Sequence, residues 1–479
     1  MKNLMMIALL ILFISGMCSQ VWSQEAVSAQ QVEQKLSLER EKGLEEQPTV
    51  KGGLNLEDAL KLSLTYNRAL QIVLEEKTIA KGRIWESYGE ALPQVMFAGS
   101  YTRLDQVSSI EFEGMKINLN YLNNYSNALS IVQPIYRGGR AGAALRASKL
   151  YKLLVDENIR TLVMGTVFET VRSYYQVLLA QQQSMVTEEF VKLAEAHVKD
   201  VETKRKYGVA SDFNVLRSEV ELSNARALLI EYRNQLQIAI LYLLKTMGVS
   251  QDSQIDLVDQ LGYSPMQVNE EEALQQALAN RPELEGAKLT VKLQQEAINS
   301  AKSNYWPGID AFFNWNIARP DPHVSMFDKW GQAWNAGISF NFTIFDGLRR
   351  EGQLIRERAT LKQYQTRLLD SQEQIIFEIN SALTGLQNAA ESLEAQKLTL
   401  NQANEGLRLA EAGFKEGVLD QVSVLEARHA LTQAKLLYNT SLFTHSMARL
   451  EVQRATGTLV RKQTMGISYP LPTDIYYKK

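Results

Sequence analysis

The residues best suited to acid–base or metal chemistry are few and scattered along the 479-residue chain. There are four histidines, and two of them, His429 and His445, fall on one predicted helix, where we expect both at the surface. The single cysteine, Cys18, precludes a disulfide framework or a cysteine-based metal site. The sequence has no His-Glu-x-x-His pair, no Gly-x-Ser-x-Gly elbow and no P-loop. We therefore expect no enzyme and no cofactor; an exported enzyme has no supporting residues.

A glycine-rich segment resembles a phosphate loop only superficially. Residues 137–140 (Arg-Gly-Gly-Arg) lack the Lys-Ser/Thr ending and fall at a predicted strand-to-helix junction. Their counterpart later in the chain, residues 346–349, begins with an aspartate, which does not suit an anion. We interpret both segments as turns.

The composition excludes some partners. The 51 basic and 54 acidic residues give a net charge of −3, with no long block of either sign. Nucleic-acid binding needs a concentrated basic surface, so we expect no nucleic-acid partner. A hydrophobic content of 45% is typical of an ordered protein. The low number of glycines (27) and prolines (10) favours long uninterrupted elements.

The N-terminus is typical of a signal peptide, residues 1–23. Lys2 supplies the positive charge, the apolar run that follows is too short to span a bilayer comfortably, and cleavage is predicted after Ser23. A retained membrane anchor is the alternative, and Cys18 could be lipidated, although the preceding methionine is not the expected small residue. Residues 24–53 are polar and predicted to be flexible. No later segment has 18 consecutive apolar residues, so the exported chain is either soluble or inserted as a β-barrel.

The rest of the chain is duplicated. Residues 57–60 (Glu-Asp-Ala-Leu) return as residues 271–274 (Glu-Glu-Ala-Leu) at an offset of 214, and Gly208 returns as Gly417 at an offset of 209. Copies of about 200 residues are too long for a solenoid unit and indicate a duplicated half-protein. The predicted segments are a first repeat at 54–250, a linker at 251–269, a second repeat at 270–460 and a C-terminal tail at 461–479.

Each repeat contains a long predicted helical hairpin. From residue 344 to residue 416 there is no proline, and the apolar residues are spaced by three, four or seven, as in coiled coils. About 70 residues at 1.5 Å each give a helix of roughly 105 Å, too long for an ordinary globular domain. The first repeat has the same feature over residues 137–207. Returning helices are predicted at 213–246 and 422–455, and shorter helical segments at 56–91 and 271–305.

Two segments in each repeat alternate between apolar and polar residues. The pattern predicts strand pairs at about 308–344 and, more weakly, at about 94–135. A half-buried soluble hairpin and a sugar-binding aromatic platform are the alternatives, but alternate aromatic spacing in an exported, duplicated chain favours a lipid-facing surface. The predicted lipid-facing residues are Phe313, Trp315, Trp334, Ile338, Phe340 and Phe342. In the first pair, the predicted apolar face is Val95, Phe97, Gly99, Tyr101, Tyr125, Leu129, Ile131 and Ile135.

This duplicated arrangement resembles the TolC-like outer membrane efflux family over residues 54–459. The resemblance implies a mainly α fold with a small β part and two structural repeats per protomer. It further implies a homotrimer whose 12-stranded outer membrane β-barrel continues as a long periplasmic α-helical barrel. The segments that carry the resemblance are residues 56–60, 92–93, 133–139, 207–209, 414–418 and 455–457.

The resemblance also implies a function. It points to an outer membrane exit duct of a tripartite efflux or type I secretion system, which extends into the periplasm and conducts substrates passively. The implied partners are a periplasmic membrane fusion (adaptor) protein, an inner membrane transporter and outer membrane lipid. The alternative is a periplasmic coiled-coil adaptor or scaffold.

The resemblance places the periplasmic entrance and the adaptor docking site at the two helix breaks. The acidic ring positions of the family fall on Ser423, Glu426 and Asn214, of which only Glu426 is charged, and Asp420 could supply a substitute nearby. Alternatively, Asp420 and Glu426 are solvated acids favoured by the helix dipole. The expected entrance residues are Tyr207, Gly208, Asn214, Phe414, Gly417, Asp420, Ser423 and Glu426.

Overall fold

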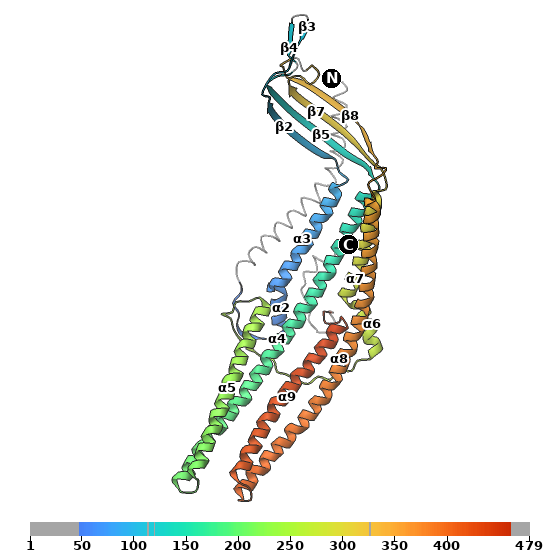
Figure 1. The fold of residues 1–479 in the computed structure, drawn as a ribbon. Helices are drawn as coiled ribbons and strands as arrows, with labels where there is room; N and C mark the ends of the chain where they lie inside the picture. The colour runs from blue at the N-terminus through green and yellow to red at the C-terminus, as the bar shows by residue number, and fades with distance from the viewer. Residues whose placement is uncertain (1–46, 113–114, 119, 325–326, 461–479) are drawn as a thin grey trace.

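The computed structural model describes residues 47–112, 115–118, 120–324 and 327–460 (Figure 1). The predicted signal peptide, residues 24–46 and the tail at 461–479 lie outside these ranges. The described chain is elongated, with a curved β-sheet at one end and long helices that run from the sheet to the opposite end (Figure 1). Within the described ranges, none of the helices combines the length and the apolar character needed to cross a membrane.

The helices follow the same order in both repeats. The two longest have 67 residues each, so the turns that follow them lie at the same end of the molecule (Figure 1). In the first repeat the helices are α2 (Leu56–Tyr66), α3 (Arg68–Gly89), α4 (Arg140–Lys206) and α5 (Asp212–Met247). In the second they are α6 (Glu270–Asn280), α7 (Pro282–Ser303), α8 (Arg349–Lys415) and α9 (Gln421–Ala455).

Each shorter helical segment is broken once, which the periodicity did not indicate. Asn67 ends α2 in an extended conformation, and its Oδ1 accepts a hydrogen bond from the Leu70 N–H at 3.1 Å to cap α3. Arg281 separates α6 from α7 because the following Pro282 favours an extended residue before it and suits the first position of a helix.

The main sheet has four antiparallel strands and joins the two repeats. Strands β2 (Gln94–Arg103) and β5 (Asn123–Arg137) belong to the first repeat, and β7 (Gly308–Arg319) and β8 (Gly331–Asn341) to the second. Their order is β2-β5-β7-β8, so β5 pairs with β7 across the repeats. Strands β2 and β8 each have one edge that the described chain leaves unpaired.

Two short strand pairs were not predicted from the sequence. Strand β1 (Lys51–Leu54) pairs in parallel with β6 (Gln254–Leu257), although residues 51–53 were assigned to the flexible segment and 251–269 to a linker. Such short strands, which lie far apart in the chain, carry too little alternation to be recognised. Strands β3 (Ser109–Phe112) and β4 (Met115–Asn118) form a hairpin within the loop between β2 and β5.

The first hairpin is anchored near the middle of the molecule by buried contacts. Tyr174 of α4 is fully buried, and its hydroxyl donates to the Leu54 carbonyl at 3.0 Å and to Asp259 Oδ2 at 2.6 Å. The same carboxylate accepts the Leu56 N–H at 3.0 Å. The β1–β6 pair and α2 are thereby fixed to α4, which holds the base of the hairpin in place.

Candidate functional site

The predicted lipid-facing residues of the second strand pair share one face of the sheet. Trp315 lies opposite Trp334, and residues directly opposite each other in antiparallel strands point to the same side. The rings of Phe313 and Trp334 stack with centroids 6.3 Å apart. Ile338 and Phe340 lie on this face and are 71% and 65% exposed, so a large apolar surface is uncovered in the single chain.

Phe342 lies outside this arrangement. Strand β8 ends at Asn341, so Phe342 follows the last paired residue and is half exposed. The structure therefore brings five of the six predicted lipid-facing residues onto one face of the sheet and leaves Phe342 at its margin.

The opposite face of the sheet is polar. Asn314 Oδ1 accepts from Ser130 Oγ at 2.6 Å, and Asn314 Nδ2 donates to Asn335 Oδ1 at 2.9 Å, so one side-chain ladder spans β5, β7 and β8. Arg137 pairs with Asp310 at 2.9 Å on the same face. One apolar and one polar face are what a sheet between lipid and a watery channel requires.

The first strand pair extends the apolar face, but one residue predicted on that face does not lie there. Ile135 was predicted on this face, but the pairing of β5 with β7 shifts between Pro134 and Tyr136. Tyr136 lies opposite Ile309 and takes the apolar position instead. Proline has no N–H for the ladder and favours such a β-bulge, which reverses the alternation beyond it.

At the far end, the first three predicted entrance residues lie in the turn after α4 and in the first turn of α5. Tyr207 ends α4 and is 81% exposed. Gly208 has a φ of +74°, a conformation that glycine adopts without steric penalty. Asn214 lies in the first turn of α5, where its N–H donates to Ser211 Oγ at 3.3 Å. The turn is closed by these backbone and cap interactions.

The turn after α8 is built in the same way. Gly417 has a φ of +77°. Asp420 caps α9, since its Oδ1 accepts from the Ser423 N–H at 3.0 Å and from Ser423 Oγ at 2.7 Å. These hydrogen bonds lower the pKa of the Asp420 carboxyl. Glu426 is exposed one turn further along α9. The structure thus brings Asp420 and Ser423 together, as a helix cap, with Glu426 nearby.

Contacts between the two hairpins near this end were missed by the sequence analysis. The Lys204 ammonium of α4 lies 5.0 Å from the ring centroid of Phe414 of α8. Lys435 of α9 pairs with Glu189 of α4 at 2.8 Å. Residues that belong to different repeats give no shared periodic signal, so only the fold reveals these contacts.

One histidine was placed wrongly from the sequence. His429 is exposed as predicted, but His445 is only 2% exposed, because the linker residue Tyr263 packs over its ring with centroids 4.9 Å apart. Burial, together with Arg449, lowers the pKa of His445. Among the described residues, no group of three or more histidine, cysteine or acidic side chains could hold a metal ion.

A model of the outer membrane efflux protein family matches residues 89–249 and 273–458. The chain belongs to the outer membrane efflux protein family. Protein CyaE of Bordetella pertussis is 20% identical over 419 residues, covering 86% of each chain. The outer membrane protein TolC of Escherichia coli is 20% identical over 420 residues, covering 85% of this chain and 83% of its own.

A solved structure shows the same fold. The CmeC outer membrane channel of Campylobacter jejuni superposes with a TM-score of 0.72 at 14% sequence identity, covering 88% of each chain. As a member of the efflux family, the chain is an outer membrane channel protein with a periplasmic helical extension. The family match excludes the alternative of a periplasmic adaptor or scaffold.

Proposed function

We propose that three copies of this chain close one 12-stranded barrel and one helical tunnel, and that the trimer is the exit duct of a tripartite efflux or type I secretion system. The observation that carries the proposal is the four-stranded sheet with two free edges. Unpaired backbone groups cannot be exposed to lipid, so four strands from one copy need further strands to close a barrel. Pairing β8 of one copy with β2 of the next supplies them.

The helices support the same ring. Helix α4 packs against both α5 and α9, and α9 packs against α8, so α5 and α8 form the two outer edges of the helical wall. Both edges carry exposed apolar side chains, which coiled coils normally bury against a partner. On α5 these are Phe213, Leu216, Val220, Ile230 and Ile238, and on α8 they are Ile355, Leu369, Ile376, Leu398 and Leu409.

The outward edges α5 and α8 carry opposite charges at matching distances from the hairpin turns. Glu219 lies about two turns after the start of α5, and Arg408 lies about two turns before the end of α8. Glu231 and Lys397 each lie about five turns from the same two helix ends. Because the helices run in opposite directions, these positions meet when α5 of one copy packs against α8 of the next. Opposite charges across the seam help to fix the register.

The hairpin turns at the far end of the duct indicate where a periplasmic partner would bind. Exposed apolar residues at the turns, among them Tyr207 and Val418 at 81% and 79% exposure, provide a contact surface for the hairpin of a periplasmic adaptor. The resemblance adds an inner membrane transporter, which would supply the energy for a passive duct.

Charged substitutions on the two sheet faces test the barrel. Ile338→Arg places a charge on the lipid face, which costs about 2–4 kcal/mol at mid-membrane, so we expect less trimer in the outer membrane. Ser339→Arg is its matched control on the polar face and should assemble with altered conductance. An equal response of assembly to both substitutions would contradict a barrel with one lipid face.

The entrance residue Glu426 has its own test. Three exposed copies around one axis favour cations, so Glu426→Ala should weaken the cation selectivity of single channels. Glu405→Ala is the control, because Glu405 lies higher on α8 and pairs with Arg408 of its own helix. Unchanged selectivity in Glu426→Ala would show that Glu426 is an ordinary solvated acid.

A further inference from the structure

The end of the main sheet that lies farthest from the helices carries a cluster of three aromatic rings (Figure 1). The Tyr101 ring of β2 lies 5.0 Å from the Tyr125 ring of β5, and Tyr125 lies 5.8 Å from Trp330, which precedes β8, measured between centroids. The three side chains are between 38% and 56% exposed, so each ring remains open to its surroundings. Tyrosine and tryptophan have an apolar body and a polar tip, which suits the boundary between lipid and water.

The cluster lies at the height expected of the outer membrane surface. Ile309 and Arg319 lie on the apolar face at opposite ends of β7, ten residues apart. At a rise of about 3.4 Å per residue and a tilt of about 40°, they are separated by about 25 Å along the membrane normal, the height of the apolar band of outer membrane barrels. Tyr125 lies opposite Arg319, so the aromatic cluster is level with the lipid headgroups.

Two ion pairs hold the loop that positions Trp330. Arg319 Nε and Nη2 donate to the two carboxylate oxygens of Asp328 at 2.8 and 3.0 Å, a bidentate arrangement. Lys329 lies 3.7 Å from Asp321. The cations of Arg319 and Lys329 are therefore already matched by carboxylates, and neither is available as the main partner of an anion from outside.

Arg103, at the outer end of β2, differs from these two cations. It is exposed, and among the described residues no acidic side chain forms an ion pair with it. It lies opposite Asn123, on the same face as Tyr101 and Tyr125. The Tyr101 hydroxyl donates to Asn123 Oδ1 at 2.9 Å, so the amide NH2 of Asn123 provides a second donor beside the guanidinium of Arg103.

We propose that Arg103, Asn123 and the three aromatic rings form a binding site for the phosphate headgroup of a lipid in the outer leaflet. The arginine fork matches phosphate oxygens, and the amide adds a donor. The acyl chains of the same lipid would lie along the rings and the apolar face below them. A phosphate attached to acyl chains satisfies the cation and the apolar surface together. The inference rests on the proposed barrel, which assigns the apolar face to lipid.

Native mass spectrometry of the delipidated protein in mild detergent tests the site. The probe is lipid A with two phosphates, and the comparison is the same lipid after enzymatic removal of both. We expect the wild-type protein to bind the phosphorylated form about tenfold more tightly, the effect of one hydrogen-bonded contact between charged groups. Arg103→Gln should abolish this preference, and Arg103→Lys should retain part of it. Asn123→Ala leaves the arginine in place and should weaken the preference by about threefold.

Lys329→Gln is the matched control, because it removes one positive charge from the same end of the sheet, and it should keep the full preference. A wild-type protein without the preference, or an undiminished preference in Arg103→Gln, overturns the site. Displacement of the lipid by an equal concentration of inorganic phosphate would also overturn it, since the site would then bind free phosphate. A trimer without the preference overturns the lipid site alone. A single-chain mass with the preference intact overturns the trimer and leaves the lipid site standing.

Discussion

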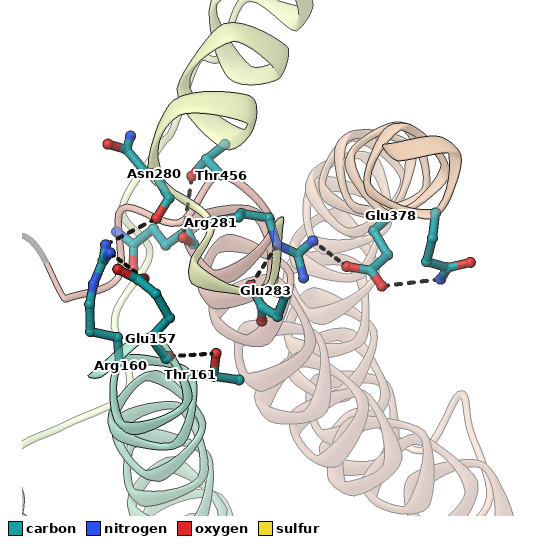
Figure 2. A network of polar contacts seen from close by, with 10 residues as sticks. Glu157, Arg160, Thr161, Asn280, Arg281, Glu283, Glu378 and Thr456 are labelled. Carbon is teal, nitrogen blue, oxygen red and sulfur yellow. Dashed lines mark hydrogen bonds and ion pairs between the residues drawn. The ribbon is translucent and has the colours of Figure 1, made fainter. Parts of the chain in front are cut away.

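At the base of the first hairpin, Asn67 Nδ2 donates to the Thr246 carbonyl at 2.9 Å, a contact between neutral groups. The residue at the equivalent position of the second repeat is Arg281, which pairs with Glu378 of α8 and with Glu283 at 3.4 Å (Figure 2). The junction between the two short helices of each repeat is therefore held to its long hairpin by a neutral hydrogen bond in the first repeat and by charged side chains in the second.

The side chains that surround these two junctions also differ between the repeats. Tyr242 of the first hairpin donates a hydrogen bond to Glu169 Oε1 of α4 at 2.7 Å. Its counterpart in the second hairpin is Glu451, which lines an open pocket of about 350 Å³ between α8 and α9 together with Phe377 and Ser381. The duplication has retained the backbone path, while side-chain packing at the two bases has diverged.

The largest expected effect concerns the glycines that end each hairpin. Gly248 and Gly457 have φ angles of +75° and +67°. A Cβ at Gly248 would lie 2.2 Å from the Tyr66 carbonyl oxygen, whereas at Gly457 its nearest atom, Asn280 Cβ, would be 3.1 Å away. We expect Gly248→Ala to lower the free energy of unfolding by about 3–5 kcal/mol and Gly457→Ala by about 1–2 kcal/mol, measured by urea unfolding of the helical circular dichroism signal. Equal losses would contradict the tighter packing of the first base.

Removing the charged contact should have the next largest effect. Arg281→Met leaves the partly buried Glu378 without its cation, which we expect to cost about 1–3 kcal/mol, while Asn67→Ala removes a helix cap worth about 1 kcal/mol. The double variant Arg281→Met, Glu378→Met should recover part of the loss, because no unpaired charge remains. Additive losses would argue against a direct interaction.

The stability of the two hairpin bases should also depend differently on pH. Burial acts to raise the pKa of Glu378, but hydrogen bonds from Arg281 and Gln374 outweigh it and lower that pKa below 4.5. A lowered pKa gives stability that is present above pH 4.5 and is lost as the pH falls through the folded-state value. Acid unfolding should therefore begin at the second base, seen as earlier hydrogen exchange in α8 than in α4. Glu378→Gln should remove this difference, and its persistence would assign the acid sensitivity to other groups.

The smallest effect is expected at Tyr242. Its hydroxyl is near the surface, so Tyr242→Phe should cost only about 0.5 kcal/mol in the same urea measurement. A loss as large as that of Arg281→Met would show that this exposed hydroxyl–carboxylate hydrogen bond contributes as much as the Arg281–Glu378 ion pair.

Much of the architecture could be predicted from the sequence because it is periodic. The heptad-like spacing identified α4 and α8, and the breaks at Gly208 and Gly417 indicated the returning helices α5 and α9. The alternation in the second strand pair placed Trp315 and Trp334 on one face. The errors have local or long-range causes. The β-bulge after Pro134 moves Ile135 out of register, and the β1–β6 pair is too short to be periodic.

The contacts between hairpins could not be predicted at all. Glu221 and His429 belong to different repeats, and each fits an ordinary coiled-coil surface in its own helix. His445 likewise has the spacing of a surface residue, but in the fold it is buried and the ring of Tyr263 packs against it. Such contacts depend on how the repeats pack together, which no pattern within one repeat records.

The mass of the intact assembly extracted from outer membranes tests the central claim most directly. Native mass spectrometry in mild detergent should give three times the mass of the same chain after denaturation, as expected if the free edges at β2 and β8 and at α5 and α8 are closed by neighbouring copies. A single-chain mass, or recovery of the protein from the soluble periplasmic fraction, would contradict a trimeric outer membrane duct.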